Sequence, residues 1–155
     1  MAKRRSGFSL VELMIVVIVI GIMVSMALPA LSRARSQAAL SSATARFART
    51  VGVARQAAIL RGKRSHFRMT DGVLWVTVDT GATAADSLVI VAPFPIDSTY
   101  GLSGVTPAGA TSIEFDPRGV STQSSQQVFR FTHPKGLKDS LCVSKLGNSI
   151  RTVCP

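Results

Sequence analysis

Glu12 occupies a position that requires a chemical explanation, because it is the only ionisable residue between Phe8 and Leu31. The segment is otherwise predominantly apolar, and it is long enough to cross the hydrocarbon layer of a membrane, roughly 30 Å thick, as a helix. A carboxylate in lipid is costly unless it is protonated or paired with a cation. We therefore expect a membrane-inserted chain in which Glu12 is a functional residue with a cationic partner.

The other polar residues give little support to catalysis. Nucleophilic catalysis needs a Ser or Cys beside an oriented base, and acid/base catalysis needs convergent carboxylates or His. His66 and His133 have no recognisable partner pattern, and the acidic residues are scattered singly among expected turns. We expect no enzyme, no catalytic residue, no cofactor, no bound metal and no small-molecule substrate.

The two cysteines, Cys142 and Cys154, lie close together near the C-terminus. In an oxidising compartment such a pair predicts a disulfide that closes a short loop and stabilises the fold by about 2 to 4 kcal/mol. A metal site would need two further ligands, and redox catalysis would need a Cys-x-x-Cys pattern or a nearby base.

The chain is strongly basic, with 18 Lys and Arg, 8 Asp and Glu, and a formal net charge of +10. Between Leu13 and Thr70 there is no acidic residue, so this stretch could meet anionic lipid, nucleic acid or acidic neighbouring subunits, or form a solvated helix face. A second basic group accompanies a single acid, Asp139; it comprises Lys135, Lys138, Lys145 and Arg151. Such a patch could bind DNA phosphates without sequence preference, although few aromatic residues are present for base stacking.

The elements that position these residues begin with one long helix. The apolar segment, residues 8–31, is expected to continue as an amphipathic helix over residues 32–62, with Gly62 as the C-cap. Pro29 should kink this helix and Gly21 should weaken it. Arg35, Arg46 and Arg49 fall on the face opposite to a stripe that should pack on a globular head and that contains Leu40, Thr44, Phe47, Val51, Ala54 and Ala58.

Residues 63–155 have the pattern of a β-rich head. The expected strands are Ser65–Thr70, Val73–Asp79, Ser87–Ala92, Ser112–Asp116, Val128–His133, Ser140–Lys145 and Ser149–Val153. Asp71-Gly72 predicts a two-residue hairpin turn, and Pro93–Ala110 is expected to be a long irregular connection. The predicted fold class is α+β, with a long N-terminal helix packed on an antiparallel β-sheet head.

The N-terminal residues carry a family resemblance. Lys3, Arg4 and Arg5, followed by Gly7, Phe8 and Glu12, resemble the type III signal of type IV pilins and type II secretion pseudopilins. An ordinary signal peptide, with its shorter apolar core, and a plain membrane anchor fit the pattern less well.

The resemblance implies that prepilin peptidase removes the leader, residues 1–7, between Gly7 and Phe8, and methylates the new amine of Phe8. It also implies that Glu12 attracts the N-terminal ammonium of a neighbouring subunit, and that Gly21 and Pro29 bound a segment that can melt inside a filament. The leader cations should stay on the cytoplasmic side of the inner membrane, which leaves the C-terminal head in the periplasm.

Within this superfamily the head resembles the FimT and FimU minor pilins and the GspH pseudopilin. The resemblance rests on Phe115-Asp116-Pro117-Arg118-Gly119 and on the closing segment from Cys142 to Arg151. It implies a subunit that joins or primes assembly of a type IV pilus or a secretion pseudopilus. The alternative is a FimT-like DNA receptor for transformation. The Gly-Arg-x-Arg motif of such receptors corresponds here to Gly147-Asn148-Ser149-Ile150-Arg151, in which one arginine is displaced or absent.

Overall fold

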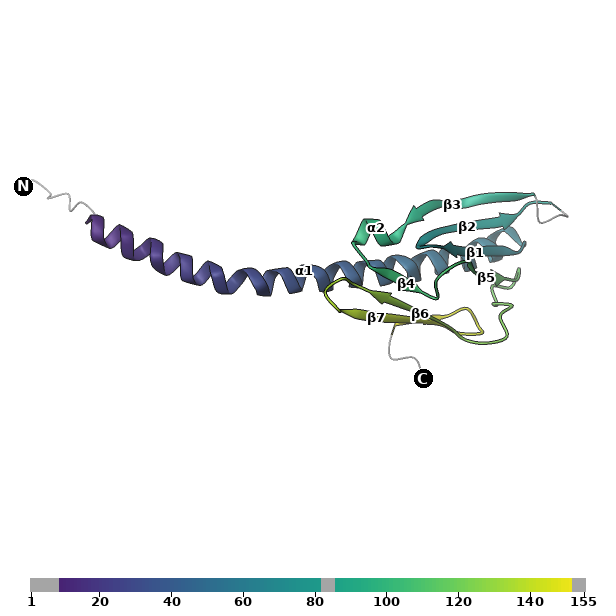
Figure 1. Ribbon diagram of the computed structural model, residues 1–155. Helices are drawn as coiled ribbons and strands as arrows, with labels where there is room; N and C mark the ends of the chain where they lie inside the picture. Colours follow the sequence, from purple (N-terminus) through teal and green to yellow (C-terminus); the bar gives the residue numbers. More distant parts are fainter. Residues whose placement is uncertain (1–8, 82–85, 152–155) are drawn as a thin grey trace, which may run out of the picture. The chain divides into compact units, whose positions relative to one another are not determined.

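The computed structural model describes residues 9–81 and 86–151. The chain divides into two compact units, Met1–Arg35 and Ser36–Pro155. A 52-residue helix, α1 (Leu10–Arg61), belongs to both units (Figure 1). Its first part is the helix of the first unit, and its second part is the first secondary-structure element of the second unit.

The first unit contains the apolar part of α1, in which every described residue from Ser9 to Leu31 is exposed. By length and composition α1 could cross a membrane. The helix continues without interruption through Gly21 and Pro29. The hydroxyls of Ser25 and Ser32 donate to backbone carbonyls three residues earlier, at 2.7 and 3.1 Å. The long N-terminal helix predicted from the sequence is therefore confirmed.

In the second unit, α1 has one buried face. Its C-terminal cap is Gly62, whose φ of +59° lies in the left-handed region, and the N–H of Lys63 donates to the carbonyl of Ala58 at 3.3 Å. Arg46 and Arg49 are exposed, as expected. The predicted stripe is confirmed, since each of its residues is at most 5% exposed: Leu40, Thr44, Phe47, Val51, Ala54 and Ala58.

The first antiparallel sheet has the strand order β3-β2-β1-β5. Its strands are β1 (Ser65–Thr70), β2 (Val73–Asp79), β3 (Ser87–Pro95) and β5 (Thr111–Phe115). The first two match their predicted ranges, and Asp71-Gly72 forms the predicted turn between them with positive φ at both residues.

The second antiparallel sheet has the order β4-β6-β7-β8. Its strands are β4 (Gly104–Thr106), β6 (Gln127–Thr132), β7 (Lys138–Val143) and β8 (Ser149–Ile150). The sequence predicted an antiparallel set without dividing it into two sheets. The division arises because β5 pairs with β1, whereas β6 pairs with β4 and β7.

The segment Pro93–Ala110 is more regular than predicted. It contains the end of β3, the short helix α2 (Ile96–Tyr100) and β4. Pro93 and Pro95 misled the prediction, because proline is disfavoured inside sheets but is tolerated on an edge strand such as β3.

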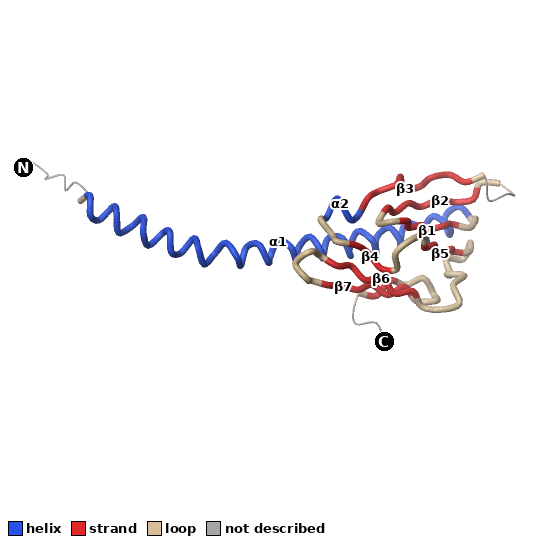
Figure 2. The backbone as a smooth tube through the Cα atoms, in the orientation of Figure 1, coloured by secondary structure: helices blue, strands red, loops and turns tan. Residues whose placement is uncertain are grey.

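The core of the second unit lies between α1 and both sheets, and Figure 2 shows strands of both sheets flanking this part of the helix. The ring centroid of Phe47 on α1 lies 4.9 Å from that of Phe67 on β1, and 4.6 and 5.4 Å from those of Phe129 and Phe131 on β6. Because side chains alternate along a strand, the residue between Phe129 and Phe131 must point outward. The core therefore decides which polar residues the second sheet presents to solvent.

Candidate assembly and anion-binding sites

Glu12 lies in the first turn of α1, where a carboxylate interacts favourably with the helix dipole. Its neighbours Val11, Leu13 and Met14 are apolar and more than half exposed. Within residues 9–81 and 86–151, no cationic side chain forms an ion pair with Glu12. Gly7 and Phe8, where processing is predicted, lie outside the described residues.

Asp139 on β7 connects this strand to α1 and to the residue that follows β8. Its Oδ2 atom accepts hydrogen bonds from Arg151 Nε at 3.0 Å and from Arg151 Nη2 at 2.8 Å. The hydroxyl of Thr44 on α1 lies 2.7 Å from the same oxygen, and the Ser140 N–H donates to Oδ1 at 2.9 Å. Asp139, the single acid that accompanies the predicted basic patch, therefore binds Arg151.

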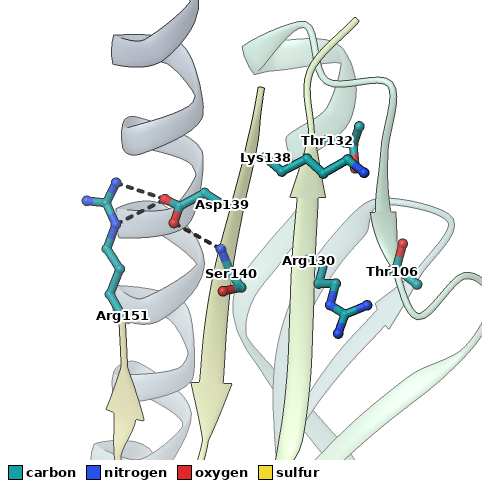
Figure 3. A pocket seen from close by; sticks show the side chains of 7 residues that line it. All are labelled: Thr106, Arg130, Thr132, Lys138, Asp139, Ser140 and Arg151. Atoms are coloured by element: carbon teal, nitrogen blue, oxygen red, sulfur yellow. Dashed lines mark hydrogen bonds and ion pairs between the residues drawn. The ribbon is translucent and has the colours of Figure 1, made fainter. Parts of the chain in front are cut away.

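The outer face of the second sheet carries a surface depression of about 710 Å³ (Figure 3). Arg130 lies opposite Thr106 in the β4–β6 register, and Lys138 lies opposite Thr132 in the β6–β7 register. Figure 3 shows Lys138 extending from β7 toward Thr132. The lining residues are all polar or charged: Thr106, Arg130, Thr132, Lys138, Asp139, Ser140 and Arg151.

The other two predicted phosphate-binding residues lie at opposite ends of β7. Lys135 belongs to the turn between β6 and β7, where its N–H donates to His133 Nδ1 at 3.2 Å. Lys145 is exposed in the turn between β7 and β8. The six residues of β7 separate these turns by about 20 Å at 3.4 Å per residue. Of the predicted patch, only Lys138 and Arg151 line the same depression.

Arg130 is the residue that the sequence analysis missed. The segment Gln127–Thr132 alternates around Phe129 and Phe131, which are fully buried, and this alternation places Arg130 on the exposed face. The pattern is visible in the sequence. The sequence does not show that Arg130 and Lys138 lie close together, because their proximity depends on the register between β6 and β7.

The Asp116–Gly119 turn, part of the motif that suggested the minor pilin branch, closes against α1. Asp116 Oδ1 accepts the N–H groups of Arg118 at 3.0 Å and Val120 at 2.8 Å. The hydrogen bond from the Val120 N–H is the main cause that lowers the pKa of Asp116. Gly119, with φ +76°, lies against Ile59 of α1 and leaves no room for a side chain.

The remaining candidates for chemistry are the two cysteines and His66. Cys142 is buried on β7, and Cys154 lies outside the described residues, so their disulfide stays a prediction. His66 on β1 lies 3.1 Å from Asp79 Oδ1 on β2. Among the described residues, no group of three or more His, Cys, Asp or Glu side chains is arranged to hold a metal ion.

The N-terminal pattern and the fold each resemble those of known proteins. Residues 2–28 match the family model described as the prokaryotic N-terminal methylation motif. That motif overlaps the start of α1, and the later part of this helix packs on an antiparallel head, as in the pilin fold. The exposed apolar part of α1 that lies within this motif fits membrane anchoring.

The fold is similar to that of the type IV minor pilin FimU from Pseudomonas aeruginosa strain PAO1, known from a crystal structure. The TM-score is 0.52, and the alignment covers 73% of this chain and 87% of FimU at 14% sequence identity. At this identity the likeness concerns the fold. No curated protein matches the sequence.

Proposed function

We propose that this chain is a minor pilin or pseudopilin that is inserted in the inner membrane and joins or primes the assembly of a type IV pilus or a type II secretion pseudopilus. The observation that carries the proposal is the first half of α1, which is apolar and exposed on all sides and contains one carboxylate, Glu12. A surface of this kind requires a cover of lipid or of other apolar helices.

In this proposal prepilin peptidase cuts between Gly7 and Phe8, and the amine of Phe8 is methylated. The ammonium of Phe8 in one subunit then pairs with Glu12 of its neighbour. The matched motif supports this step, because its range, residues 2–28, includes both the predicted cleavage site and Glu12. The leader cations remain in the cytoplasm, and the head, residues 63–155, lies in the periplasm.

The test of the pairing is Glu12→Gln, which removes the charge and keeps the shape of the side chain. The variant is expected to remain in the membrane fraction and to be missing from sheared filaments. Glu114→Gln, the same chemical change in the head, is the matched control and should be incorporated normally. Normal incorporation of Glu12→Gln would refute the ammonium pairing.

Processing has an independent test. The mass spectrum of the protein from assembled filaments should correspond to a chain that begins at methylated Phe8. A mass that includes residues 1–7 would contradict cleavage. The same sample, digested without reduction, should give a peptide pair linked through Cys142 and Cys154.

Melting of the segment bounded by Gly21 and Pro29 belongs to the same proposal. The described helix is continuous through both residues, so melting would occur on incorporation into the filament. Hydrogen exchange of the backbone between these residues should be faster in filaments than in micelles of neutral detergent. Equal protection in the two states would exclude melting.

A second candidate function is capture of DNA for natural transformation. It is favoured by the basic character of the second unit, in which there are 13 Lys and Arg and 7 Asp and Glu between Ser36 and Pro155. Lys138 and Arg151 share one depression, and Lys135 and Lys145 lie at the ends of the same strand. The full chain in neutral detergent should retard double-stranded DNA at low salt, and unchanged DNA mobility would remove this role.

A further inference from the structure

The outer face of the second sheet concentrates groups that bind oxyanions. Arg130 and Lys138 occupy outward positions on neighbouring strands and are diagonal to each other in the β6–β7 register. Three hydroxyl groups from the same face surround them, on Thr106, Thr132 and Ser140. Cationic side chains and hydroxyls are the groups with which proteins contact phosphate.

Both cations are available to a ligand. Arg130 and Lys138 are exposed, and neither forms an ion pair with a residue in the described ranges. Asp139, the acid at the edge of the depression, is turned toward α1 by the alternation of β7 and is bound by Arg151 and Thr44. The two cations therefore keep their positive field toward solvent.

The lining also limits the class of ligand. Peptide and small-molecule sites usually contain apolar or aromatic side chains that give most of the affinity. None of the described lining residues is apolar or aromatic. Contacts limited to charges and hydroxyls suit a polyanion whose backbone is recognised without reference to its bases.

We propose that Arg130 and Lys138 form a phosphate-binding site for the backbone of a nucleic acid, with the hydroxyls of Thr106, Thr132 and Ser140 completing it. This site rests on the second candidate function, but it assigns the main phosphate contacts to Arg130 and Lys138. Arg151, which corresponds to the arginine of the C-terminal motif, is engaged by Asp139 and contributes less than Arg130 and Lys138.

The test compares two double variants of the full chain in neutral detergent, with a labelled 20-base-pair duplex as the probe. Arg130→Gln/Lys138→Gln removes the site. Lys63→Gln/Arg68→Gln removes the same charge from two exposed residues, one just before β1 and one within it, and is the matched control. Unchanged thermal unfolding of both variants establishes that they are folded.

The site variant should bind the duplex more weakly, and its affinity should depend less on salt. Two lost phosphate contacts reduce the slope of log K against log salt by about 1.8, so that between about 50 and 200 mM salt the wild-type affinity falls about 12-fold more than that of the variant. The control should retain the wild-type slope.

Three outcomes would overturn the site, and they are distinguishable from one another. Equal weakening of both double variants would mean that net charge alone binds DNA, which leaves the second candidate function in place. No binding of either the duplex or poly-glutamate by the wild type would remove that function and the site together. Binding of poly-glutamate but not of the duplex, with loss in the site variant, would assign the depression to an acidic protein partner.

Discussion

Phe47→Ala is expected to cause the largest loss of stability among single truncations in the core, because Phe47 joins α1 to both sheets. Its side chain is fully buried and contacts Phe67 of the first sheet and both Phe129 and Phe131 of the second. Truncation of a buried Phe to Ala typically costs about 3 to 5 kcal/mol. Since three aromatic pairs are lost together, we expect the upper part of this range.

The assay is thermal unfolding of the full chain in neutral detergent, followed by the fluorescence of Trp75, which is half-buried on β2. For the 120 residues from Ser36 to Pro155, an unfolding entropy of about 0.25 kcal/mol/K converts the loss into a decrease in Tm of about 12 to 20 °C. The control is Phe94→Ala, which removes the same atoms from a partly buried ring. An equal decrease for the two variants, or a decrease below about 6 °C for Phe47→Ala, would refute the assignment of Phe47 as the central contact.

Three further predictions concern Asp97 in α2 and the Asp116–Gly119 turn. Burial raises the pKa of Asp97, so its ionisation opposes folding at neutral pH; Asp97→Asn should raise Tm at about pH 7, and the gain should vanish below about pH 3.9. The hydrogen bond from the Val120 N–H lowers the pKa of Asp116, so the ionised carboxylate stabilises the fold above the ordinary Asp pKa. This contribution is lost as the pH falls through the lowered pKa. The variant Asp116→Asn should therefore show a flatter dependence of Tm on pH between about 2 and 5. Gly119→Ala should cost about 1 to 2 kcal/mol from its positive φ, plus a clash with Ile59 that the additional change Ile59→Ala relieves in a double-mutant cycle.

The parts of the fold that local periodicity determines were predicted from the sequence. The stripe on α1 follows from spacing at 3.6 residues per turn, and β1 and β2 follow from a Gly-containing turn between two short alternating runs. The division into two sheets was not predicted, because it depends on which distant strands pair. β4 is only three residues long and lies in a segment rich in Gly and Pro, so its pairing with β6 left no local pattern.

The candidate sites show the same limit. Glu12 could be identified from the sequence because its surroundings are its own neighbours along the chain. The basic patch was predicted because its residues are close in sequence, but the fold separates them. Lys135 and Lys145 lie at opposite ends of β7, and Arg151 is bound to Asp139. The register between β6 and β7 places Arg130 in the site, and this register cannot be derived from sequence spacing alone.

The two parts of α1 differ in what can cover them, and this difference connects the helix to assembly. From Leu40 to Ala58 the buried residues form a stripe, so one face is covered by the head and the other is polar. From Leu10 to Leu31 the apolar residues lie on all sides of the helix and are exposed, so one flat partner surface could not cover all of them. Lipid would cover such a surface uniformly but would leave a carboxylate without a cation, whereas in the assembly proposed above a bundle of like helices would cover it and would also bring a neighbouring N-terminus within reach of Glu12. In that proposal the acid favours the assembled state over the membrane-inserted monomer, which is the direction that polymerisation from a membrane requires.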